Sequence, residues 1–445
     1  MSDLLSIGAS GVRAYQTALG TVADNIANAS TPGYTRKTTT VRELSATTGT
    51  QASPTLNGVL VDGLSRATDA YRSADVRQSS ADLARTETGV AWLDRIETSL
   101  SGNQLATRLG SFFAAGSALA ADPTSIAARS TMLESATSVA SAFRATGQSL
   151  DQISSDLDGT ANSAVTSLNG LASALAKTND GLGRAAAGST GAAQLMDHRD
   201  SILEQMSALT DVSVTTDTAG RAAVRMGGTN GPLLVSGVDA GIVTYVRNSA
   251  GAVSYAVHRG GESAAAAPNG GALAGVADSA QRIADTRAEI ARVASAFTAG
   301  VNAVQAQGRD LDGNAGAPMF ATGDSPTDIS LTLTDPRGIA AAGVGGGTRD
   351  NSNLVALQTL RTSGGYEAAV TSLTTTNAAT LAARSDVADA QSAIRDTAVA
   401  ARDSVSGVNL DEEAVDLLRF QQAYQASSRV IQVARETLQT LFDLR

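Results

Sequence analysis

The sequence predicts a mainly α-helical protein with an inserted β-rich domain: terminal helices forming a coiled coil, a helical-bundle middle domain and a small outer β domain. Three observations support this prediction. Apolar residues recur at helical spacing near both ends of the 445-residue chain. Long helical periodicity flanks a region of period-two strands. The elements also follow an order that is symmetrical about the middle of the sequence, so the two ends can form one domain.

The first predicted helix carries an apolar stripe. Its members recur at alternating steps of three and four residues, as in a coiled-coil seam, over about 25 residues. A helix with such a stripe needs a partner against which to bury it. The stripe consists of Leu5, Gly8, Val12, Tyr15, Leu19, Val22 and Ile26.

The last predicted helix offers a matching stripe. Asn409 supplies an N-cap and acidic residues fill the first turn, so this helix is expected to begin near residue 410 and to run to the end of the sequence. Its apolar residues lie seven apart at Leu410, Leu417, Tyr424, Ile431 and Leu438, with Phe420, Ala434 and Leu441 between them.

Two interpretations of these stripes stay open. Both helices could be ordinary amphipathic members of one bundle, and base rates favour that interpretation. Chain ends usually fray unless something holds them, however, so two full-length stripes at the extreme ends suggest coupling to other subunits.

The elements between the two ends follow from local signals. Pro32 and Gly33 end the first helix in a turn, and residues 56–66 indicate a short strand or hairpin after a Thr-rich polar stretch. Residues 70–209 are helical, with breaks near 101–102, 122–123 and 181–191. Period-two strands occupy 211–260, and helical patterns return at 278–307, 350–362 and 366–404.

This order predicts three domains. Residues 1–45 and 405–445 form the inner domain of terminal helices, and residues 46–210 and 270–404 form the helical middle domain. Residues 211–269 form a β-rich domain inserted at the tip.

Composition excludes several classes of protein. The net charge of −10 disfavours general binding to nucleic acid or to an anionic membrane, since both need a cationic face. The chain has no cysteine, which excludes disulfides and thiolate sites. No apolar run approaches the roughly 20 residues that span a bilayer. The first residues lack the features of a general secretory signal peptide, so we expect a cytosolic protein or one exported by another route.

Enzyme and metal motifs are weak. His198 and His258 are the only histidines, and neither has a carboxylate or second ligand at helical spacing. The segment that begins at Asp310 faintly resembles a calcium loop, but Ala321 stands where the bidentate glutamate is expected. We therefore expect a turn at Asp310, no cofactor, no metal and no catalysis.

Motifs at both ends identify a family. Residues 23–36 read ADNIANASTPGYTR and residues 406–431 read SGVNLDEEAVDLLRFQQAYQASSRVI. They resemble the N-terminal and C-terminal signatures of the flagellar axial proteins, the family of rod, hook and hook-associated subunits. The segments DPTSIAAR (122–129), LMDHRD (195–200) and GRDLDGNAG (308–316) resemble the branch that forms the first hook-filament junction. The resemblance extends from residue 4 to residue 442.

The resemblance implies a structural subunit of the bacterial flagellum. Such subunits leave the cell through the flagellar type III export apparatus and lie outside it, and about 11 copies are expected in a ring joined by heterologous contacts. Implied partners are other copies of the chain, the hook protein, the second junction protein (hook-associated protein 3) and a flagellar export chaperone. Neither nucleic acid nor membrane is implied.

The same resemblance implies roles for the terminal residues. Leu5, Val12, Leu19 and Ile26 would pair with Leu417, Tyr424, Ile431 and Leu438 in an inner coiled coil. Asn25, Asn28 and Tyr34 would cap and turn the inner helix at subunit contacts.

Three alternatives remain. A hook or distal-rod protein of the same family is the nearest, although the internal motifs disfavour it. A secreted adhesin-like protein would need binding by residues 211–269 alone. A cytosolic enzyme with coiled-coil ends would need a catalytic constellation, which the two isolated histidines do not provide.

Overall fold

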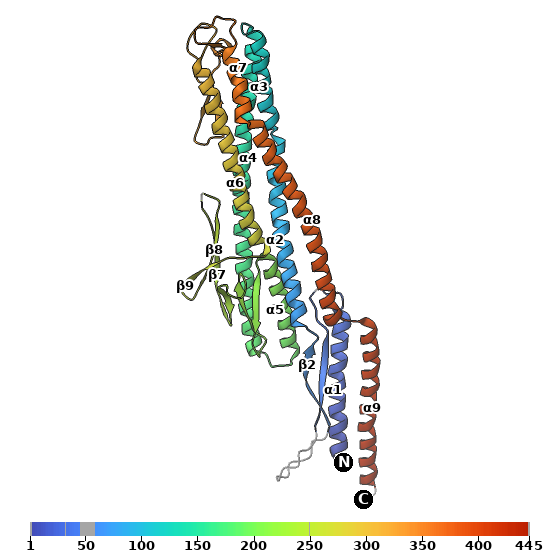
Figure 1. Cartoon of the computed structure of the whole chain (residues 1–445). Helices are drawn as coiled ribbons and strands as arrows, with labels where there is room; N and C mark the ends of the chain where they lie inside the picture. The colour runs from blue at the N-terminus through green and yellow to red at the C-terminus, as the bar shows by residue number, and fades with distance from the viewer. Residues whose placement is uncertain (1, 32, 45–57, 249, 444–445) are drawn as a thin grey trace.

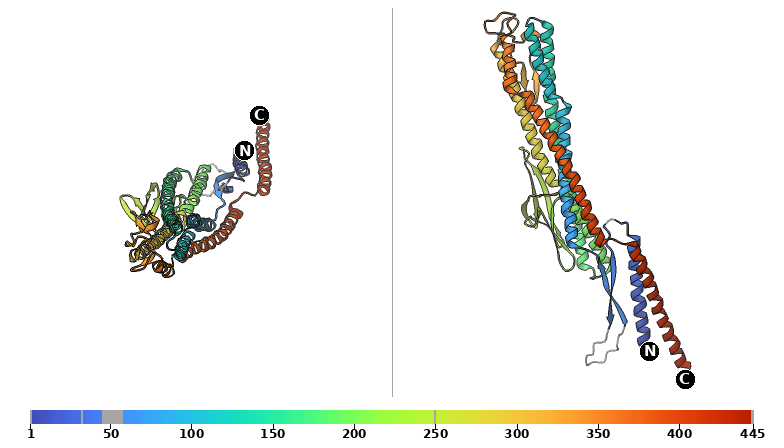
Figure 2. Two further views of the ribbon diagram at one scale, coloured as in Figure 1. Left: turned by 90° about the horizontal axis from the view of Figure 1, so that it is seen from above. Right: turned by 45° about the vertical axis from the view of Figure 1, so that its right-hand side comes forward.

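The protein is an elongated rod with both chain ends at the same end of the molecule (Figure 1). The computed structural model describes residues 2–31, 33–44, 58–248 and 250–443. The first helix, α1 (Ser2–Ala27), and the last, α9 (Leu410–Asp443), lie side by side and are offset from the main bundle in every view (Figure 2). None of the helices in the described ranges is long and apolar enough to cross a membrane.

Long helices form the body of the rod. The longest, α4, has 59 residues, which at about 1.5 Å per residue extends about 90 Å. Ser125 and Ser189 cap the N-termini of α4 and α5 by accepting hydrogen bonds from backbone N–H groups. The predicted helical breaks are confirmed as the ends of these helices. The set is α2 (Ala70–Gly102), α3 (Leu105–Ala121), α4 (Ile126–Arg184), α5 (Thr190–Leu209), α6 (Gly271–Gln307), α7 (Ser352–Gly364) and α8 (Tyr366–Ser406).

The few aromatic residues gather in one place in the core. Five of the seven phenylalanines are at most 2% exposed and belong to the same hydrophobic cluster. Ring centroids in this group lie 5.2–6.1 Å apart, several of them edge to face, which is the arrangement that aromatic quadrupoles favour. Alanine and Leu/Ile/Val residues supply most of the remaining core. The five are Phe112, Phe113, Phe143, Phe297 and Phe320.

The β-rich region lies along the side of the rod, against α4, rather than at the tip that the order of elements suggested. The position follows from the turn after α4, because α5 runs back along α4 before the strands begin. One antiparallel sheet has the order β3 (Val212–Thr216), β4 (Ala222–Met226), β5 (Leu233–Ser236), β6 (Asp239–Ala240). The other contains β7 (Ile242–Arg247), β8 (Val253–Arg259) and β9 (Glu262–Ala266).

The far end of the rod consists of α3, α7, the end of α6 and the segment 308–351 (Figure 1). That segment contains short strand pairs and a 3₁₀ turn. They are β10 (Gly308–Arg309) with β13 (Ala342–Gly343), β11 (Phe320–Thr322) with β12 (Ile329–Leu331), and η1 (Pro336–Gly338).

A β-hairpin links the terminal helices to the rod. The predicted strand at 56–66 is present as β2 (Gly58–Arg66), but its partner β1 (Lys37–Leu44) falls in the Thr-rich stretch that was predicted only as polar. β-branched threonines suit an exposed strand, which explains the difference. Gly63 is part of a β-bulge opposite Thr40.

Arg129 links the start of α4 to the segment 336–339 at the far end of the rod. Its side chain is 1% exposed, its Nε donates to the carbonyl oxygen of Pro123 at 2.8 Å, and its Nη1 donates to that of Ile339 at 2.7 Å. The same nitrogen lies 3.3 Å from the carbonyl oxygens of Pro336 and Arg337. Arg129, the last residue of the 122–129 motif, therefore donates hydrogen bonds to backbone carbonyl groups of a turn that is more than 200 residues away in the chain.

We predict that Arg129→Met lowers the free energy of unfolding by about 3 kcal/mol, because several buried carbonyl groups lose their donor. Urea unfolding followed by fluorescence of the single tryptophan, Trp92, measures it. Arg108→Met is the control, since Arg108 makes one exposed contact at 3.1 Å to Ser138 Oγ. Equal effects of the two substitutions would contradict this account.

Candidate functional site: the joined chain ends

The two terminal helices pack antiparallel. Asn25 contacts Glu413, the ring of Tyr15 lies 6.3 Å from that of Phe420, and Gly8 lies against Ile431. Residue numbers therefore rise along α1 as they fall along α9. The structure brings the two ends of the chain together along most of their length.

The most buried stripe of α1 consists mainly of small residues. Gly8, Gly11, Ala14, Ala18, Thr21, Val22 and Asn25 are the buried positions. α1 is covered on two sides, by α9 and by the hairpin, so small side chains allow close approach on both. Of the predicted stripe, Val22 is buried, while Ile26 is 37% exposed. The half-buried members are Leu5, Val12, Tyr15 and Leu19.

Most of the predicted stripe of α9 is half-buried in the single chain, and its member Ala434 is 1% exposed. Phe420 and Ile431 contact α1, and the other half-buried members share their face by helical spacing. Leu410 is 54% exposed and lies outside this contact. The half-buried positions are Leu417, Phe420, Tyr424, Ile431 and Leu438.

Gly8 marks the closest approach of the two helices. A Cβ atom added there would lie 2.6 Å from Ile431 Cγ1 and 3.3 Å from the carbonyl oxygen of Ser427. One added at Gly11 would lie 2.7 Å from Ser427 Oγ. Glycine is therefore required by packing in this part of α1, not by backbone conformation.

Asn25 is the centre of a buried polar cluster at the other end of the pair. The residue is 1% exposed, and its Nδ2 donates to the carbonyl oxygen of Lys37 at 2.8 Å and to Glu413 Oε2 at 3.0 Å. Its Oδ1 accepts from the hydroxyl of Tyr34 at 2.8 Å and from the backbone N–H of Lys37 at 3.0 Å. Both donors and both lone-pair sites of the amide are used.

Glu413 and Arg36 form the ionic part of this cluster. Glu413 is 1% exposed, and its Oε1 lies 2.7 Å from Arg36 Nε. Arg36 also reaches Glu412 at 3.0 Å and Asp416 at 3.6 Å, both in the first two turns of α9. Partial burial alone would lower the pKa of Arg36, but the hydrogen bond and charge of Glu413 outweigh it and raise that pKa. The N-terminus of α9 is thereby anchored to the chain that follows α1.

Burial and nearby carboxylates raise the pKa of the Tyr34 hydroxyl. Burial, followed by the negative charges of Asp24, Asp197 and Glu413, raises its pKa to about 12. The hydroxyl therefore keeps its proton at physiological pH and remains a donor to Asn25. Lys37 Nζ lies 4.4 Å from the centroid of the Tyr34 ring, a cation–π contact.

The turn after α1 orients these groups. Asn28 Nδ2 donates to the carbonyl oxygen of Asp24 at 2.9 Å, and the N–H of Tyr34 donates to that of Thr31 at 3.1 Å. Gly33 has φ of +77°, a conformation that glycine adopts without strain and that suits the turn predicted there. Pro32, the other residue predicted to form the turn, lies outside the described residues.

A second ionic cluster ties the hairpin to the rod. Asp197 on α5 lies 3.0 Å from Lys37 Nζ and 2.8 Å from Arg66 Nε, and Arg66 Nη2 lies 2.7 Å from Asp200. The Lys37 and Arg66 side chains are only 6% and 7% exposed. The N–H of Leu64 also donates to the carbonyl oxygen of Gly188 at 2.7 Å. Terminal helices, hairpin and rod therefore form a continuous set of contacts.

Sequence reasoning singled out Asn25 and Tyr34 but missed the charged residues of both clusters. The missed residues are Arg36, Lys37, Arg66, Asp197, Asp200 and Glu413. A signal did exist for four of them, because Arg36 ends the N-terminal motif, Glu413 lies in the C-terminal motif, and Asp197 and Asp200 lie in LMDHRD. Charged residues inside specific motifs point to buried ion pairs when their partners are known, and a single sequence does not show the partners.

The candidate catalytic and metal residues lie apart from one another. His198 is exposed on α5, and His258 on β8 lies 3.0 Å from the hydroxyl of Thr244. Asp310 Oδ1 accepts from the N–H groups of Asp312 and Asn314, which confirms the predicted turn. In the described ranges, no three His, Cys, Asp or Glu side chains gather as metal ligands.

Comparison with protein families agrees with this architecture. The model of the flagella basal body rod protein matches residues 5–35, and that of the C-terminal part of the flagellar basal body rod FlgEFG proteins matches residues 402–444. The two matched segments are the ends of the chain that pack together in the structure. They place the chain in the class of flagellar axial proteins. The model of the flagellar hook-associated protein FlgK helical domain matches residues 92–320, just over half of the chain, and the chain belongs to this family.

Relatives carry the name flagellar hook-associated protein 1. The protein from Salmonella typhimurium is 27% identical over 334 residues, covering 73% of this chain and 60% of the relative. That from Escherichia coli K12 is 27% identical over 364 residues, covering 77% of this chain and 66% of the relative. The match thus spans about three-fifths of the Salmonella protein.

A solved structure shares the fold. The flagellar hook junction protein FlgK from Burkholderia pseudomallei superposes with a TM-score of 0.50 at 23% identity. The match covers 56% of this chain and 47% of that one.

We predict that Gly8→Leu separates α9 from α1, because overpacking at such a contact costs about 1–3 kcal/mol. Trypsin then cleaves after Arg429 and Arg435 faster than in the parent protein. Gly20→Leu is the matched control, since nothing lies within 4 Å of a Cβ atom at that position. Unchanged cleavage in the Gly8 variant would contradict close packing of the two helices.

A second prediction separates the buried carboxylate from its exposed neighbour. Glu413→Ala leaves Arg36 and Asn25 without their partner and costs about 3 kcal/mol, so amide hydrogen exchange in α9 accelerates about 100-fold. Glu412→Ala removes a contact of the same arginine from a side chain that is 59% exposed, and less than about 1 kcal/mol is expected. If both variants exchange alike, burial is not the deciding factor.

Proposed function

We propose that the chain is a structural subunit of the bacterial flagellum that forms the junction between hook and filament. The relatives are named flagellar hook-associated protein 1, and the proposal assigns the corresponding role to this chain. It rests on one observation above all: the joined terminal helices leave a second apolar face of α9 uncovered. The family is one of structural flagellar proteins, and the proposed role needs no catalysis.

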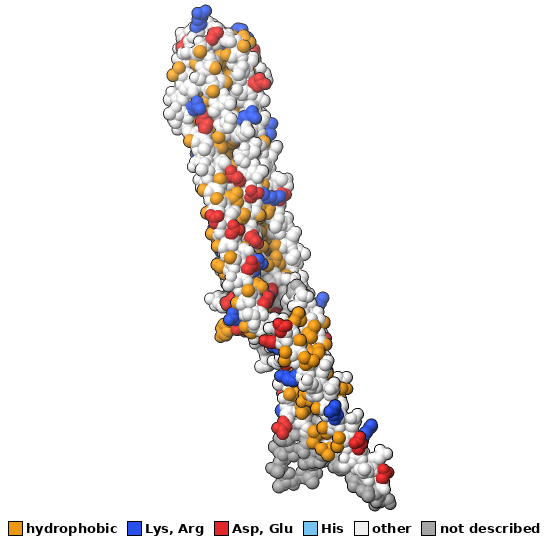
Figure 3. Space-filling view, turned by 90° about the vertical axis from the view of Figure 1, so that its right-hand side faces the viewer, with side chains coloured by type: hydrophobic (Ala, Val, Ile, Leu, Met, Phe, Trp, Pro, Cys, Tyr) orange, Lys and Arg blue, Asp and Glu red, His pale blue; other side chains and the backbone are white. Residues whose placement is uncertain are grey.

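The uncovered face lies opposite the contact with α1. Val415, Leu418, Val430 and Val433 are 65%, 58%, 38% and 59% exposed. At about 100° per residue, Val415, Leu418 and Val433 lie about 140–160° around α9 from Phe420. Val430 lies about 80° from Phe420, at the edge of this face. Figure 3, in which α9 faces the viewer, has apolar side chains gathered over this lower part of the molecule. Such a face on a soluble subunit favours burial against neighbours.

The proposed assembly uses the predicted division of the chain. Residues 1–45 with 405–445 form the inner coiled-coil layer, residues 46–210 with 270–404 form the middle layer, and residues 211–269 lie outermost. About 11 copies would form the ring, joined by heterologous contacts. Its neighbours would be the hook protein and the second junction protein, and an export chaperone would hold the terminal helices before type III export to the cell exterior.

A hook or distal-rod protein of the same class is the second candidate. The rod-protein models match the two ends of the chain, at residues 5–35 and 402–444. The match of the hook-associated helical domain over residues 92–320 favours the junction. An adhesin-like role would rest on the outer strands alone.

We predict that Val415→Asp with Val433→Asp leaves a folded monomer but abolishes filament attachment, since one charge near each end of this apolar face opposes its burial. Counts of filaments per cell and flagellin in the medium measure the loss. Val238→Asp is the control, because Val238 is equally exposed, at 57%, on the β-rich region. Normal filaments in the double variant would overturn the role of this face.

Immunogold labelling of intact flagella distinguishes the candidates. One spot at the hook-filament boundary supports the junction. Label along the hook supports the second candidate, and label away from flagella contradicts both.

A further inference from the structure

A groove in the rod contains three arginines, two of which have no acidic partner in the described part of the chain. It lies between α2, α6 and α8, with Trp92 and Ile96 on its floor, 5% and 0% exposed. Arg85, Arg282 and Arg384 line it, one from each helix. We call this the arginine groove.

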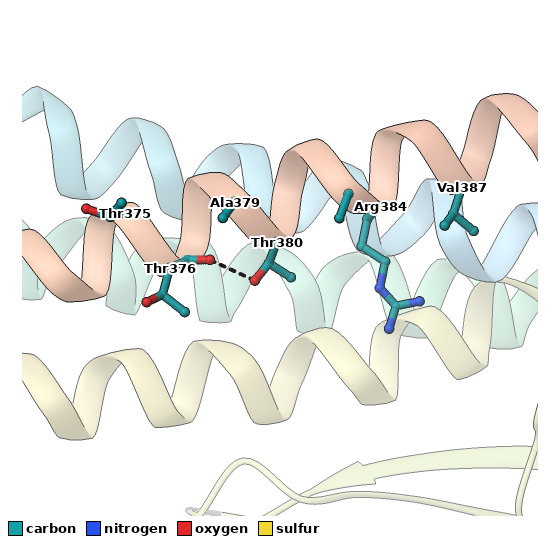
Figure 4. A pocket seen from close by; sticks show the side chains of 7 residues that line it. Thr375, Thr376, Ala379, Thr380, Arg384 and Val387 are labelled. Atoms are coloured by element: carbon teal, nitrogen blue, oxygen red, sulfur yellow. Dashed lines mark hydrogen bonds between the residues drawn. The ribbon is translucent and has the colours of Figure 1, made fainter.

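The three arginines differ in their pairing. Arg85 Nη2 lies 2.8 Å from Asp278, so its charge is balanced. Arg282 and Arg384 make no ion pair with any residue in the described part of the chain. Figure 4 shows Arg384 extending from α8 toward α6, with Thr380 and Val387 along the same stripe. Two uncompensated cations therefore lie at the rim of an apolar floor in a protein of net charge −10.

The opposite side of the same two helices is acidic. At about 100° per residue, Asp389 lies about 140° around α8 from Arg384, and Asp94 lies about 180° around α2 from Arg85. Asp386 and Glu87 accompany them, and all four are exposed without an ion pair among the described residues. We call these four residues the acidic edge. Figure 3 shows acidic side chains spread along the middle of the rod.

We propose that the arginine groove receives the acidic edge of a second copy of this chain. This inference rests on the proposed function, in which copies stand side by side. Because groove and edge lie on opposite sides of the α2–α8 layer, they cannot meet within one molecule. Neighbours related by rotation in a ring present one to the other, which is a heterologous contact.

Charge and shape support this occupant. Copies that each carry −10 repel one another, and a local cationic groove opposite an acidic edge offsets that repulsion and selects one orientation. Val387 and Ile394 beside the groove on α8 are 41% and 60% exposed, so a helix lying there would cover them. Pairing at this level would set the lateral register of the rods.

Cross-linking tests the contact directly because the chain has no cysteine of its own. Flagella are isolated from cells that express R384C with D389C and are treated with a short bismaleimide. An Arg–Asp contact keeps Cα atoms further apart than the about 4.4–6.8 Å of a disulfide, hence the reagent. Each copy then links to the next, and a ladder of dimers, trimers and larger species is expected. R384C alone, with one cysteine per copy, is expected to stay monomeric, because the proposed contact does not bring two copies of residue 384 together.

The cross-linking result and the immunogold position together separate this inference from the proposed function. If the protein lies at the hook-filament boundary by immunogold and the double variant gives no ladder, the inference fails and the proposed function stands. A dimer from R384C alone indicates a symmetric contact and also overturns it. If the protein is absent from flagella, both the proposed function and this inference fall.

Charge reversal provides an independent test on filaments per cell. R384E and D389R each place like charges at the contact, so each lowers the count several-fold. The double variant R384E/D389R exchanges the two charges in every copy and restores the count. Losses that add in the double variant would overturn the pairing.

Discussion

Contact between the first and last helices is the constraint on which the rest of the molecule depends. Asn25 and Glu413 are separated by 388 residues in the chain and share a hydrogen bond of 3.0 Å. Closing so long a loop requires the middle of the chain to run out along the rod and back again. The long antiparallel helices meet this requirement, since α4 and α6 extend along the rod and α2 and α8 lie side by side.

The contact is specified by polar groups more than by apolar area. Small residues bring α1 close to α9, and half-buried apolar residues flank that approach. Asn25 and the partly buried Arg36 both bond to the buried Glu413, and these hydrogen bonds form only in a single register because each has a defined partner. Buried ionic groups are weak sources of net stability, so we interpret this cluster as a device that selects one arrangement of the ends.

The hairpin carries that arrangement to the rod. Lys37 is common to both clusters, through its backbone to Asn25 and through its side chain to Asp197. Moving the terminal helices relative to the rod would therefore expose or separate buried charges. These contacts therefore fix the angle between the terminal helices and the rod.

The sequence alone determined which segments are helical and that both ends carry stripes in need of partners, because helical periodicity is a local property. It also identified Asn25, Tyr34 and the turn at Gly33 through motifs. Only the tertiary structure decided which face of α1 is buried, that the strands lie beside the rod, and that the Thr-rich stretch pairs with β2. The two charged clusters were also visible only in the tertiary structure. Arg36 and Glu413 are 377 residues apart and Arg66 and Asp197 are 131 apart, and no local pattern records which charges the fold will bring together.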